Sequence, residues 1–558
     1  MGKLSDKPAI ADLVAICAAR GLKRVIISPG SRNAPLSISF LGHGGFDVQV
    51  IGDERSAGFI ALGMSQSDHK PTILVCTSGS ALLNYLPAVS EAYYQRIPLL
   101  ILSADRPEEW VDQMEGQTMR QRGSMSNFVN REFHLPQEAG SADRQWYSAR
   151  LVNDAITATH WPKCGPVHVN IPLKEPLYGQ IEASPEPKII HPSISTPGLP
   201  SNYDKLKGEV SEAQKVMVIL GLDKTQSVSA DTLARLAKKG VVILNETSSN
   251  SASPQALSWI DRTIAAIPES ERQAFVPDLL ITAGGPLVSK RIKTWLRNEK
   301  IAAHWHVDEV EAEKDLFQSL TCSIYCAEGP LLEAFASDLP ESDPTYLHRW
   351  EELHKKVLHS HDDFLSQAPF SDLKAYQTIL EMIPSDSIVQ MANSAAVRYV
   401  QLFPNRPDIT YYGNRGVSGI EGCTSTAMGL STQVERPVFL LSGDMAFRYD
   451  GNAFWNDLRP KNLKCIVINN HGGGIFRIIP GPDSTDHLDR AFEAHQENSA
   501  EKMARMYDLE YRVVSDEPEL KSGMDWLIAS QGPAILEVFT PREKNADILR
   551  EYFEFLGQ

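Results

Sequence analysis

The sequence predicts an α/β protein made of three doubly wound, mostly parallel-sheet domains. Short apolar runs that are typical of buried strands alternate with helical patterns along the chain. Each run ends at a polar turn marked by glycine or proline, as in open α/β sheets that bind ligands at the carboxyl ends of their strands. At 558 residues the chain is long enough for about three or four domains with full cores.

Composition narrows the class of protein. The hydrophobic and charged shares, 42% and 22%, are those of an ordinary globular protein. The formal net charge of −16 argues against a nucleic-acid surface, although local arginines can still make an anion-binding pocket. Seven scattered cysteines favour reduced thiols. No apolar run approaches the ~20 residues of a membrane span, and the N-terminus lacks a signal-peptide core, so we expect a cytoplasmic protein with neither membrane nor nucleic-acid partners.

We expect the first domain to comprise residues 1–181. A stretch rich in proline and serine over 182–202 is typical of an interdomain linker. The candidate strands of the first domain are 24–28, 46–51, 71–76 and 98–103.

The central domain is expected over residues 203–338. Its candidate strands are 215–220, 241–244, 278–282 and 302–307. The domain has no GxGxxG sequence, so a Rossmann nucleotide site is not supported. His304 and His306 alternate on the last strand and share one face. Because no third metal ligand is apparent, we interpret them as residues of a half-buried strand.

The third domain is expected over residues 339–558. It begins with an acidic helix from Leu347 to about Leu365, whose four histidines we interpret as solvated. Its candidate strands are 387–391, 409–412, 437–442 and 465–468. They repeat the rhythm of the first domain, but only as a pattern, since no residue-level repeat is visible.

A candidate metal site lies at two strand ends of the third domain. Asp444 follows one apolar run and Asn470 follows the next, so parallel strands would bring a carboxylate and an amide to one sheet edge. The glycines after Asn470 let the backbone approach a ligand and expose a carbonyl, which we place at Gly472. Such oxygen ligands suit Mg²⁺ that holds a diphosphate. The alternative is an ordinary sheet with acidic and amide loop ends.

This pair of strand ends resembles the signature of thiamine-diphosphate enzymes, although Met445 stands where glycine is usual. The resemblance implies that Asp444, Asn470 and the carbonyl of Gly472 bind Mg²⁺, or Mn²⁺ in its place, and that the metal holds the cofactor diphosphate. It also makes the first domain the pyrimidine-binding domain and the third the diphosphate-binding domain.

Glu54 stands after a predicted strand, where a helix of small residues begins. Taken alone, it is a solvent-facing acid stabilised by the helix dipole. The resemblance implies that it bonds the pyrimidine N1′ and promotes the imino tautomer that activates C2, while the cofactor performs the carbanion chemistry. It also places Ile420 between the two cofactor rings, where the alternative is a flexible loop over 413–422. The other cofactor contacts that it implies are Thr77, Ser394, Ser418, Ile475 and Phe476.

Further motifs narrow the resemblance to one branch, the 2-succinyl-5-enolpyruvyl-6-hydroxy-3-cyclohexene-1-carboxylate (SEPHCHC) synthases of menaquinone biosynthesis. His471 departs from it by standing where asparagine is common. The resemblance implies a transferase that decarboxylates 2-oxoglutarate and joins the succinyl carbanion equivalent to isochorismate by 1,4-addition, giving SEPHCHC and CO₂. The matching segments are 28–36, 53–59, 77–81, 103–107, 413–422 and 469–476.

Cationic residues near strand ends fit substrates with two carboxylates each, because guanidinium groups pair with carboxylates in bidentate geometry. Singly, each is more simply a solvated surface charge. The resemblance implies that Ser394, Arg398 and Arg415 bind the distal carboxylate of 2-oxoglutarate. It makes Ile475 and Phe476 an apolar wall that excludes water. The residues that it places at isochorismate are Ser31, Arg32, Arg106, Gln117, Lys290 and Arg291.

In this family the first and third domains of different subunits meet around the cofactor, which implies a homodimer or homotetramer. Two rival functions stay open. Another thiamine-diphosphate decarboxylase or carboligase, such as an acetolactate-synthase-like enzyme, predicts activity with pyruvate and a less cationic pocket. A non-catalytic binding protein on the same fold would tolerate loss of Glu54 or of the metal ligands.

Overall fold

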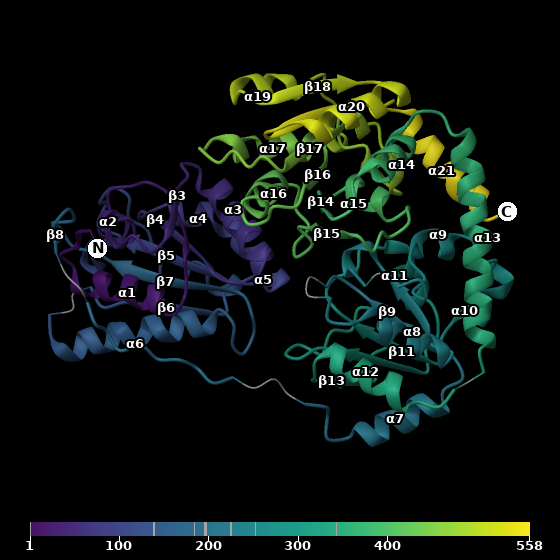
Figure 1. Ribbon diagram of the computed structural model, residues 1–558, viewed down its shortest axis with the longest axis horizontal. Helices are drawn as coiled ribbons and strands as arrows, with labels where there is room; N and C mark the ends of the chain where they lie inside the picture. Colours follow the sequence, from purple (N-terminus) through teal and green to yellow (C-terminus); the bar gives the residue numbers. More distant parts are fainter. Residues whose placement is uncertain are drawn as a thin grey trace. The chain divides into compact units, whose positions relative to one another are not determined.

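The computed structural model describes residues 2–137, 140–182, 185–194, 198–223, 226–251, 253–341 and 343–558. As the sequence predicts, they form an α/β fold with three main sheets, whose elements are labelled in Figure 1. The chain divides into two compact units. Unit 1 comprises Met1–Ile194, Asn414–Val438 and Ala446–Leu463, and unit 2 comprises Ser195–Gly413, Phe439–Met445 and Lys464–Gln558.

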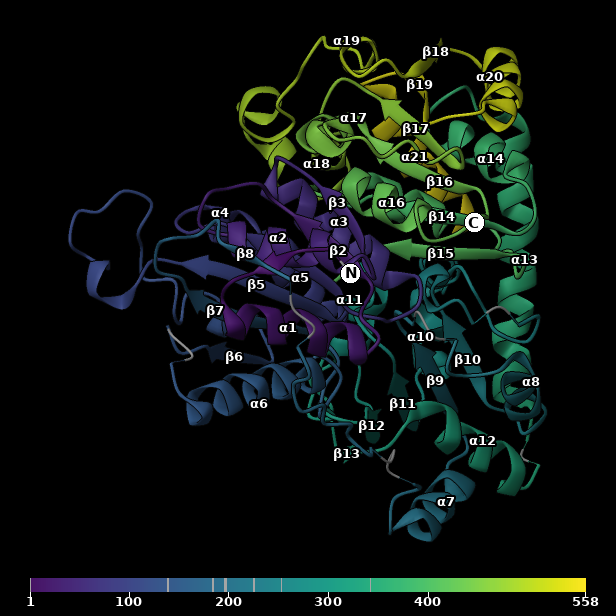
Figure 2. The same cartoon turned by 60° about the vertical axis from the view of Figure 1, so that its left-hand side comes forward.

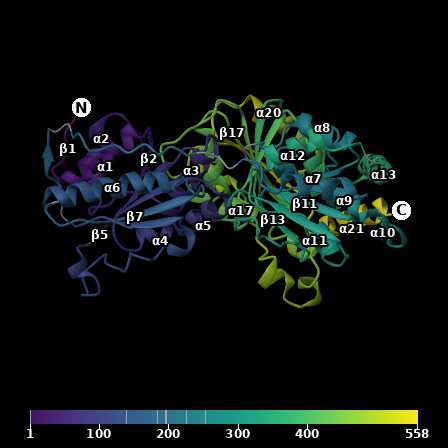
Figure 3. The same cartoon turned by 90° about the horizontal axis from the view of Figure 1, so that it is seen from below.

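The N-terminal sheet is parallel, with the strand order β3-β2-β4-β5-β7-β6. Figure 3 shows α1, α2 and α6 over one face and α4 and α5 over the other. Helices α1, α2 and α6 share a buried apolar core with the strands. The strands are β2 (Arg24–Ile27), β3 (Asp47–Val50), β4 (Thr72–Cys76), β5 (Leu99–Asp105), β6 (Arg131–His134) and β7 (Pro166–Pro172). The helices are α1 (Pro8–Ala19), α2 (Ala34–His43), α3 (Glu54–Gln66), α4 (Ala81–Asn84), α5 (Leu86–Gln95) and α6 (Ala142–Ala158). A separate two-stranded sheet pairs β1 (Leu4–Ser5) with β8 (Gln180–Ile181).

The central sheet is also parallel, in the order β10-β9-β11-β12-β13. His304 and His306 lie buried on β12, and the Thr282 hydroxyl lies 3.0 Å from Nε2 of His304 and 2.9 Å from Nδ1 of His306. They are strand residues, as predicted, although more deeply buried. The strands are β9 (Val216–Leu220), β10 (Val242–Asn245), β11 (Leu279–Ala283), β12 (Ala303–Val307) and β13 (Cys322–Ile324). Among the flanking helices are α7 (Tyr203–Glu212), α8 (Ala230–Lys238), α9 (Ile260–Ala265), α10 (Arg272–Phe275), α11 (Lys290–Arg297) and α12 (Glu328–Asp338).

The C-terminal sheet has the order β15-β14-β16-β17-β19-β18, and Figure 2 shows β14 to β17 side by side. In chain order this is the arrangement of the N-terminal sheet, so the predicted likeness of the two patterns extends to their topology. The strands are β14 (Ser387–Met391), β15 (Ile409–Gly413), β16 (Val438–Gly443), β17 (Leu463–Asn469), β18 (Glu510–Val514) and β19 (Ala534–Phe539). The helices are α14 (Asp372–Met382), α15 (Ala395–Val400), α16 (Cys423–Ser431), α17 (Asp444–Tyr449), α18 (Ile475–Ile478), α19 (Glu501–Met506), α20 (Glu517–Ala529) and α21 (Lys544–Leu556).

The histidine-bearing helix α13 (Thr345–Gln367) corrects one interpretation. Its His348 and His359 are exposed, as expected of solvated side chains. His361 is instead buried, with Nδ1 2.8 Å from the Tyr552 hydroxyl of α21, and His354 stacks on Trp259. The two inner histidines lie on the helix face that packs against neighbouring helices, so burial lowers their pKa values.

No helix in the described part of the chain combines the length and apolar character needed to cross a bilayer.

Candidate active site

In unit 2, the ends of β16 and β17 bring together the two predicted metal ligands. Asp444 is the first residue of α17, directly after β16, and Asn470 directly follows β17. The two strands are neighbours in the sheet (Figure 1). Both residues are buried, with exposed fractions of 1% for Asp444 and 6% for Asn470. The expected carboxylate and amide therefore lie at adjacent strand ends.

A hydrogen bond to Asp372 orients the Asn470 amide. Nδ2 of Asn470 donates to Oδ2 of Asp372 at 3.0 Å, and the Thr540 hydroxyl donates to Oδ1 at 2.6 Å. Because Nδ2 is engaged, Oδ1 of Asn470 is the atom left to act as a ligand. Burial raises the pKa of Asp372 to about 6, against the lowering effect of these hydrogen bonds. No spacing in the sequence pointed to Asp372.

The turn after Asn470 needs glycine. Gly472 has φ +151°, and a Cβ there would lie 2.6 Å from the Glu493 carbonyl oxygen. The Gly472 carbonyl accepts a hydrogen bond from the Gly474 N–H at 3.0 Å, which leaves it a second lone pair. Together with Asp444 and Asn470 it offers a donor set made only of oxygen, which fits Mg²⁺ and the diphosphate that it would hold.

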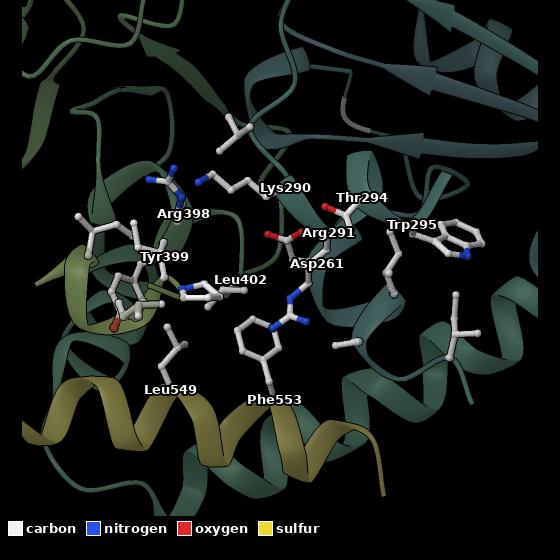
Figure 4. Close-up of a pocket in the computed structure, with 18 of the residues that line it drawn as sticks. Asp261, Lys290, Arg291, Thr294, Trp295, Arg398, Tyr399, Leu402, Leu549 and Phe553 are labelled. Atoms are coloured by element: carbon white, nitrogen blue, oxygen red, sulfur yellow. The ribbon is translucent and has the colours of Figure 1, made fainter. Parts of the chain in front are cut away.

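A cavity of about 620 Å³ in unit 2 is lined by four of the predicted site residues, namely Lys290, Arg291, Arg398 and Ile475. Figure 4 shows the first three of them. Arg291 and Lys290 begin α11, and the Arg291 guanidinium lies 4.0 Å from the centroid of the Phe553 ring. With Arg272, four cationic side chains line this cavity, which suits a ligand with carboxylates.

Ser394 and Phe476 lie beside this group rather than in it. Ser394 precedes α15 with φ +68°, and its carbonyl accepts a hydrogen bond from Nη1 of Arg398. Phe476 does not line the cavity and packs instead against Phe492.

Two acidic residues, Glu299 and Asp261, also line the cavity, and no sequence motif singled them out. Of the two, Asp261 interacts with the charges of Arg291 and Arg398. It accepts a hydrogen bond from the Ser289 hydroxyl, which also caps α11. Burial raises the pKa of Asp261, whereas the Ser289 bond and the charges of Arg291 and Arg398 lower it. The acid offsets part of the positive charge of the cavity.

In unit 1, Glu54 is the first residue of α3 and is half-buried. Its neighbour Asp53 caps the helix by accepting from the Arg55 N–H at 2.9 Å, and Nδ2 of Asn452 donates to Asp53 at 2.7 Å. Burial raises the pKa of Glu54, and the Asp53 charge adds to the rise. A raised pKa favours the protonated carboxyl, which can donate a hydrogen bond as well as accept one.

Hydrogen bonds anchor the loop between β15 and α16. The buried carboxylate of Glu91 accepts from the N–H groups of Gly416 at 2.6 Å and Val417 at 2.8 Å. These bonds tie the first part of the loop to α5, and Glu91, which no sequence motif singled out, provides them. The predicted residues in or beside this segment are Arg415, which is buried, Ser418, which has φ +65°, and Ile420, which is half-buried.

The remaining predicted residues lie at the strand ends of the N-terminal sheet. The Arg32 N–H donates to Oγ1 of Thr77 at 3.3 Å, and its guanidinium donates to the Leu173 carbonyl at 3.0 Å. Burial lowers the pKa of Arg32, and the positive charge of Arg106 lowers it further. Ser31 is exposed, and Gln117 has φ +56° beside Gly79.

Comparison with known proteins agrees with this fold. Residues 9–126 match the family described as thiamine pyrophosphate enzyme, N-terminal TPP binding domain, and residues 393–538 match its C-terminal TPP binding domain. The chain is 39% identical to the 2-succinyl-5-enolpyruvyl-6-hydroxy-3-cyclohexene-1-carboxylate synthase of Christiangramia forsetii, over 99% of this chain and 100% of the relative. It is also 39% identical to the same-named protein of Porphyromonas gingivalis, over 99% and 98%. The crystal structure of benzoylformate decarboxylase from Polynucleobacter necessarius superposes with a TM-score of 0.72 at 16% identity, covering 96% of this chain and 99% of that one, which shows the shared fold.

Proposed function

The chain belongs to the family of SEPHCHC synthases, which are thiamine pyrophosphate enzymes, and from that premise we propose its reaction. It decarboxylates 2-oxoglutarate and transfers the remaining succinyl unit to isochorismate, giving SEPHCHC and CO₂ in menaquinone biosynthesis. The observation that best supports this proposal is the cavity around which Lys290, Arg291 and Arg398 converge. Both substrates are dicarboxylates, and an enzyme for small keto acids with a single carboxylate would not need so many cations there.

The chain offers a suitable set of groups for the cofactor. Asp444, Asn470 and the Gly472 carbonyl would bind Mg²⁺, or Mn²⁺, and through it the diphosphate of thiamine diphosphate. The bound cofactor supplies the carbanion chemistry. The residues proposed to contact the rest of the cofactor are Glu54, Thr77, Ser394, Ser418, Ile420, Ile475 and Phe476.

In this proposal Glu54 holds a proton for its hydrogen bond to the cofactor. Its raised pKa keeps a proton available at the carboxyl oxygen, which can hydrogen-bond to the pyrimidine N1′. Ile475 and Phe476 would exclude water from the reacting carbon, which protonation would otherwise quench.

The cationic residues would divide between the two substrates. Ser394, Arg398 and Arg415 would bind the distal carboxylate of 2-oxoglutarate. The residues assigned to isochorismate are Ser31, Arg32, Arg106, Gln117, Lys290 and Arg291. We also propose a cytoplasmic homodimer or homotetramer in which the acid and the metal ligands of one site come from different subunits.

The decisive assay supplies purified protein with thiamine diphosphate, Mg²⁺, 2-oxoglutarate and isochorismate. We expect CO₂ release coupled to the loss of isochorismate, with a product of the SEPHCHC mass. Pyruvate alone is the control, and we expect no acetolactate from it. Acetolactate formation without isochorismate consumption would favour the rival carboligase, and the absence of any turnover would contradict both enzymatic functions.

A further inference from the structure

A second group of metal-ligating side chains lies beside the all-oxygen set. It consists of His471, His495 and Glu497, whose ligand atoms all lie within 4.8 Å of one another. Oε1 of Glu497 is 2.9 Å from Nε2 of His495, and Oε2 is 3.6 Å from Nδ1 of His471. We propose that these three side chains form a second cation site, which takes a borderline divalent ion such as Zn²⁺.

The backbone around the site is already held in place. The Gln496 N–H donates to the His471 carbonyl at 3.0 Å, and the Gly473 N–H donates to the Glu493 carbonyl at 2.7 Å. These two bonds join the turn after β17 to the segment that contains His495 and Glu497. The site therefore does not depend on bringing distant loops together.

Further contacts stabilise the two segments that carry the ligands. His471 has φ +66°, and the centroid of its imidazole lies 5.4 Å from that of the Phe539 ring. On the other segment, the carboxylate of Glu493 is buried and accepts from Nε of Arg477 at 2.8 Å. With both segments anchored, binding would mainly require rotation of the three ligand side chains.

The ligand chemistry differs from that of the neighbouring site. Imidazole nitrogen suits Zn²⁺ and other late first-row ions, whereas Mg²⁺ selects oxygen. Two histidines and one carboxylate are a known three-ligand set for zinc, with a water as fourth ligand. Ligand atoms around a tetrahedral zinc lie roughly 3.4 Å apart, so only small adjustments are needed.

Access from solvent also favours this site. The side chains of His471 and His495 are 26% and 33% exposed, and that of Glu497 is 76% exposed, so an ion can reach them from solvent. The alternative is a surface ion pair that contributes little to stability. The two alternatives differ in whether Zn²⁺ binds in a way that needs all three side chains.

The test is a calorimetric titration of Zn²⁺ into the protein saturated with thiamine diphosphate and Mg²⁺. We expect one Zn²⁺ per chain, with affinity reduced at least tenfold by His495→Ala and by Glu497→Gln. His471→Asn should have the same effect. His487→Ala is the matched control, since it removes an exposed histidine of the same region that is outside the group.

Two further variants and one spectrum separate the outcomes. Asp444→Asn should leave Zn²⁺ affinity unchanged, because it alters the all-oxygen set only. Co²⁺ in place of Zn²⁺ should give visible absorption bands that His495→Ala abolishes. The proposal is overturned if no Zn²⁺ binds, if His495→Ala and Glu497→Gln bind it as well as the unaltered chain, or if Asp444→Asn abolishes binding.

Discussion

The two six-stranded sheets share a strand order but end in different chemistry. Strands β2, β3, β4 and β5 correspond to β14, β15, β16 and β17. The third strand of each sheet in chain order is followed by Thr77 after β4 and by Asp444 after β16. The second strand of each sheet in chain order is followed by Glu54 after β3 and by Arg415 after β15. The topology thus sets where ligands can bind, and the few residues after each strand set which ligand binds there.

The equivalent helices α3 and α16, which follow β3 and β15, pack against each other in unit 1. Glycines make this close crossing possible. A Cβ on Gly63 would collide with the Thr426 carbonyl, and a Cβ on Gly429 would collide with that of Ile60. The contact is therefore reciprocal, because each of the two equivalent helices places a glycine against the backbone of the other.

The largest expected effect is a loss of cofactor affinity when the proposed metal ligand after β16 is removed. Asp444→Ala removes the only proposed side-chain anion at the metal, so Mg²⁺-dependent binding of thiamine diphosphate should weaken roughly 100-fold or more. Calorimetry with and without Mg²⁺ measures it. Asp457→Ala, at an exposed acid, is the control and should bind normally. Normal cofactor affinity in Asp444→Ala would refute the assignment.

The next effect is on KM, because different arginines are proposed to bind the two substrates. Arg415→Ala should raise KM for 2-oxoglutarate roughly 10- to 100-fold, more than KM for isochorismate, because a charge-assisted hydrogen bond is lost. Arg291→Ala should show the opposite order. Steady-state kinetics with each substrate varied measures both, and Arg297→Ala, at the other end of α11, is the control. The reverse pattern would overturn the division of the arginines.

The helix crossing can be broken by one methyl group. Gly429→Ala should lower the free energy of unfolding by about 1–3 kcal/mol, because the added carbon meets backbone that cannot move aside. Gly208→Ala is a matched control, since Gly208 also lies within a helix but faces open space, and it should stabilise slightly. Denaturant unfolding measures both, and equal stability in the two variants would contradict the close crossing.

An effect of similar size, confined to a change of pH, concerns Asp372, which orients Asn470. Folding raises its pKa from 3.8 to about 6, so across that window the folded chain keeps a proton that the unfolded chain has lost. The resulting stability is full below about pH 3.8 and is lost as pH rises through about 6. Asp372→Asn should remove this fall, roughly 1–3 kcal/mol, whereas Asp547→Asn, at an exposed acid, should keep it. Parallel pH profiles of thermal unfolding in all three proteins would contradict the shift.

The sequence predicted what is local. Buried apolar runs located the inner strands β2, β4, β5, β9, β11, β12, β14, β16 and β17, and the order of Asp444 and Asn470 along the chain was enough to place them at neighbouring strand ends. Two largely buried inner strands, β7 and β19, were not predicted. The edge strands β6, β13 and β18, which are short or carry polar residues, were not predicted either.

Support from distant parts of the chain could not be predicted. Asp372 is 98 residues from Asn470, and Glu91 is 325 residues from Gly416, so no motif connects the members of either pair. The burial of His361 also depends on Tyr552 of a helix far along the chain. These contacts arise from tertiary packing, which short-range patterns do not encode.

The most direct test of the account compares Glu54→Gln with the unaltered enzyme in two measurements on the same preparation. Because the acid is proposed to act on the pyrimidine and not to hold the diphosphate, Mg²⁺-dependent cofactor affinity should stay near that of the unaltered enzyme. The rate of SEPHCHC formation should fall roughly 10²- to 10⁴-fold. An unimpaired rate in Glu54→Gln, or a rate that falls only because the cofactor no longer binds, would contradict the proposed roles. In those roles the acid after β3 acts on the pyrimidine, and the residues after β16 and β17 hold the diphosphate through the metal.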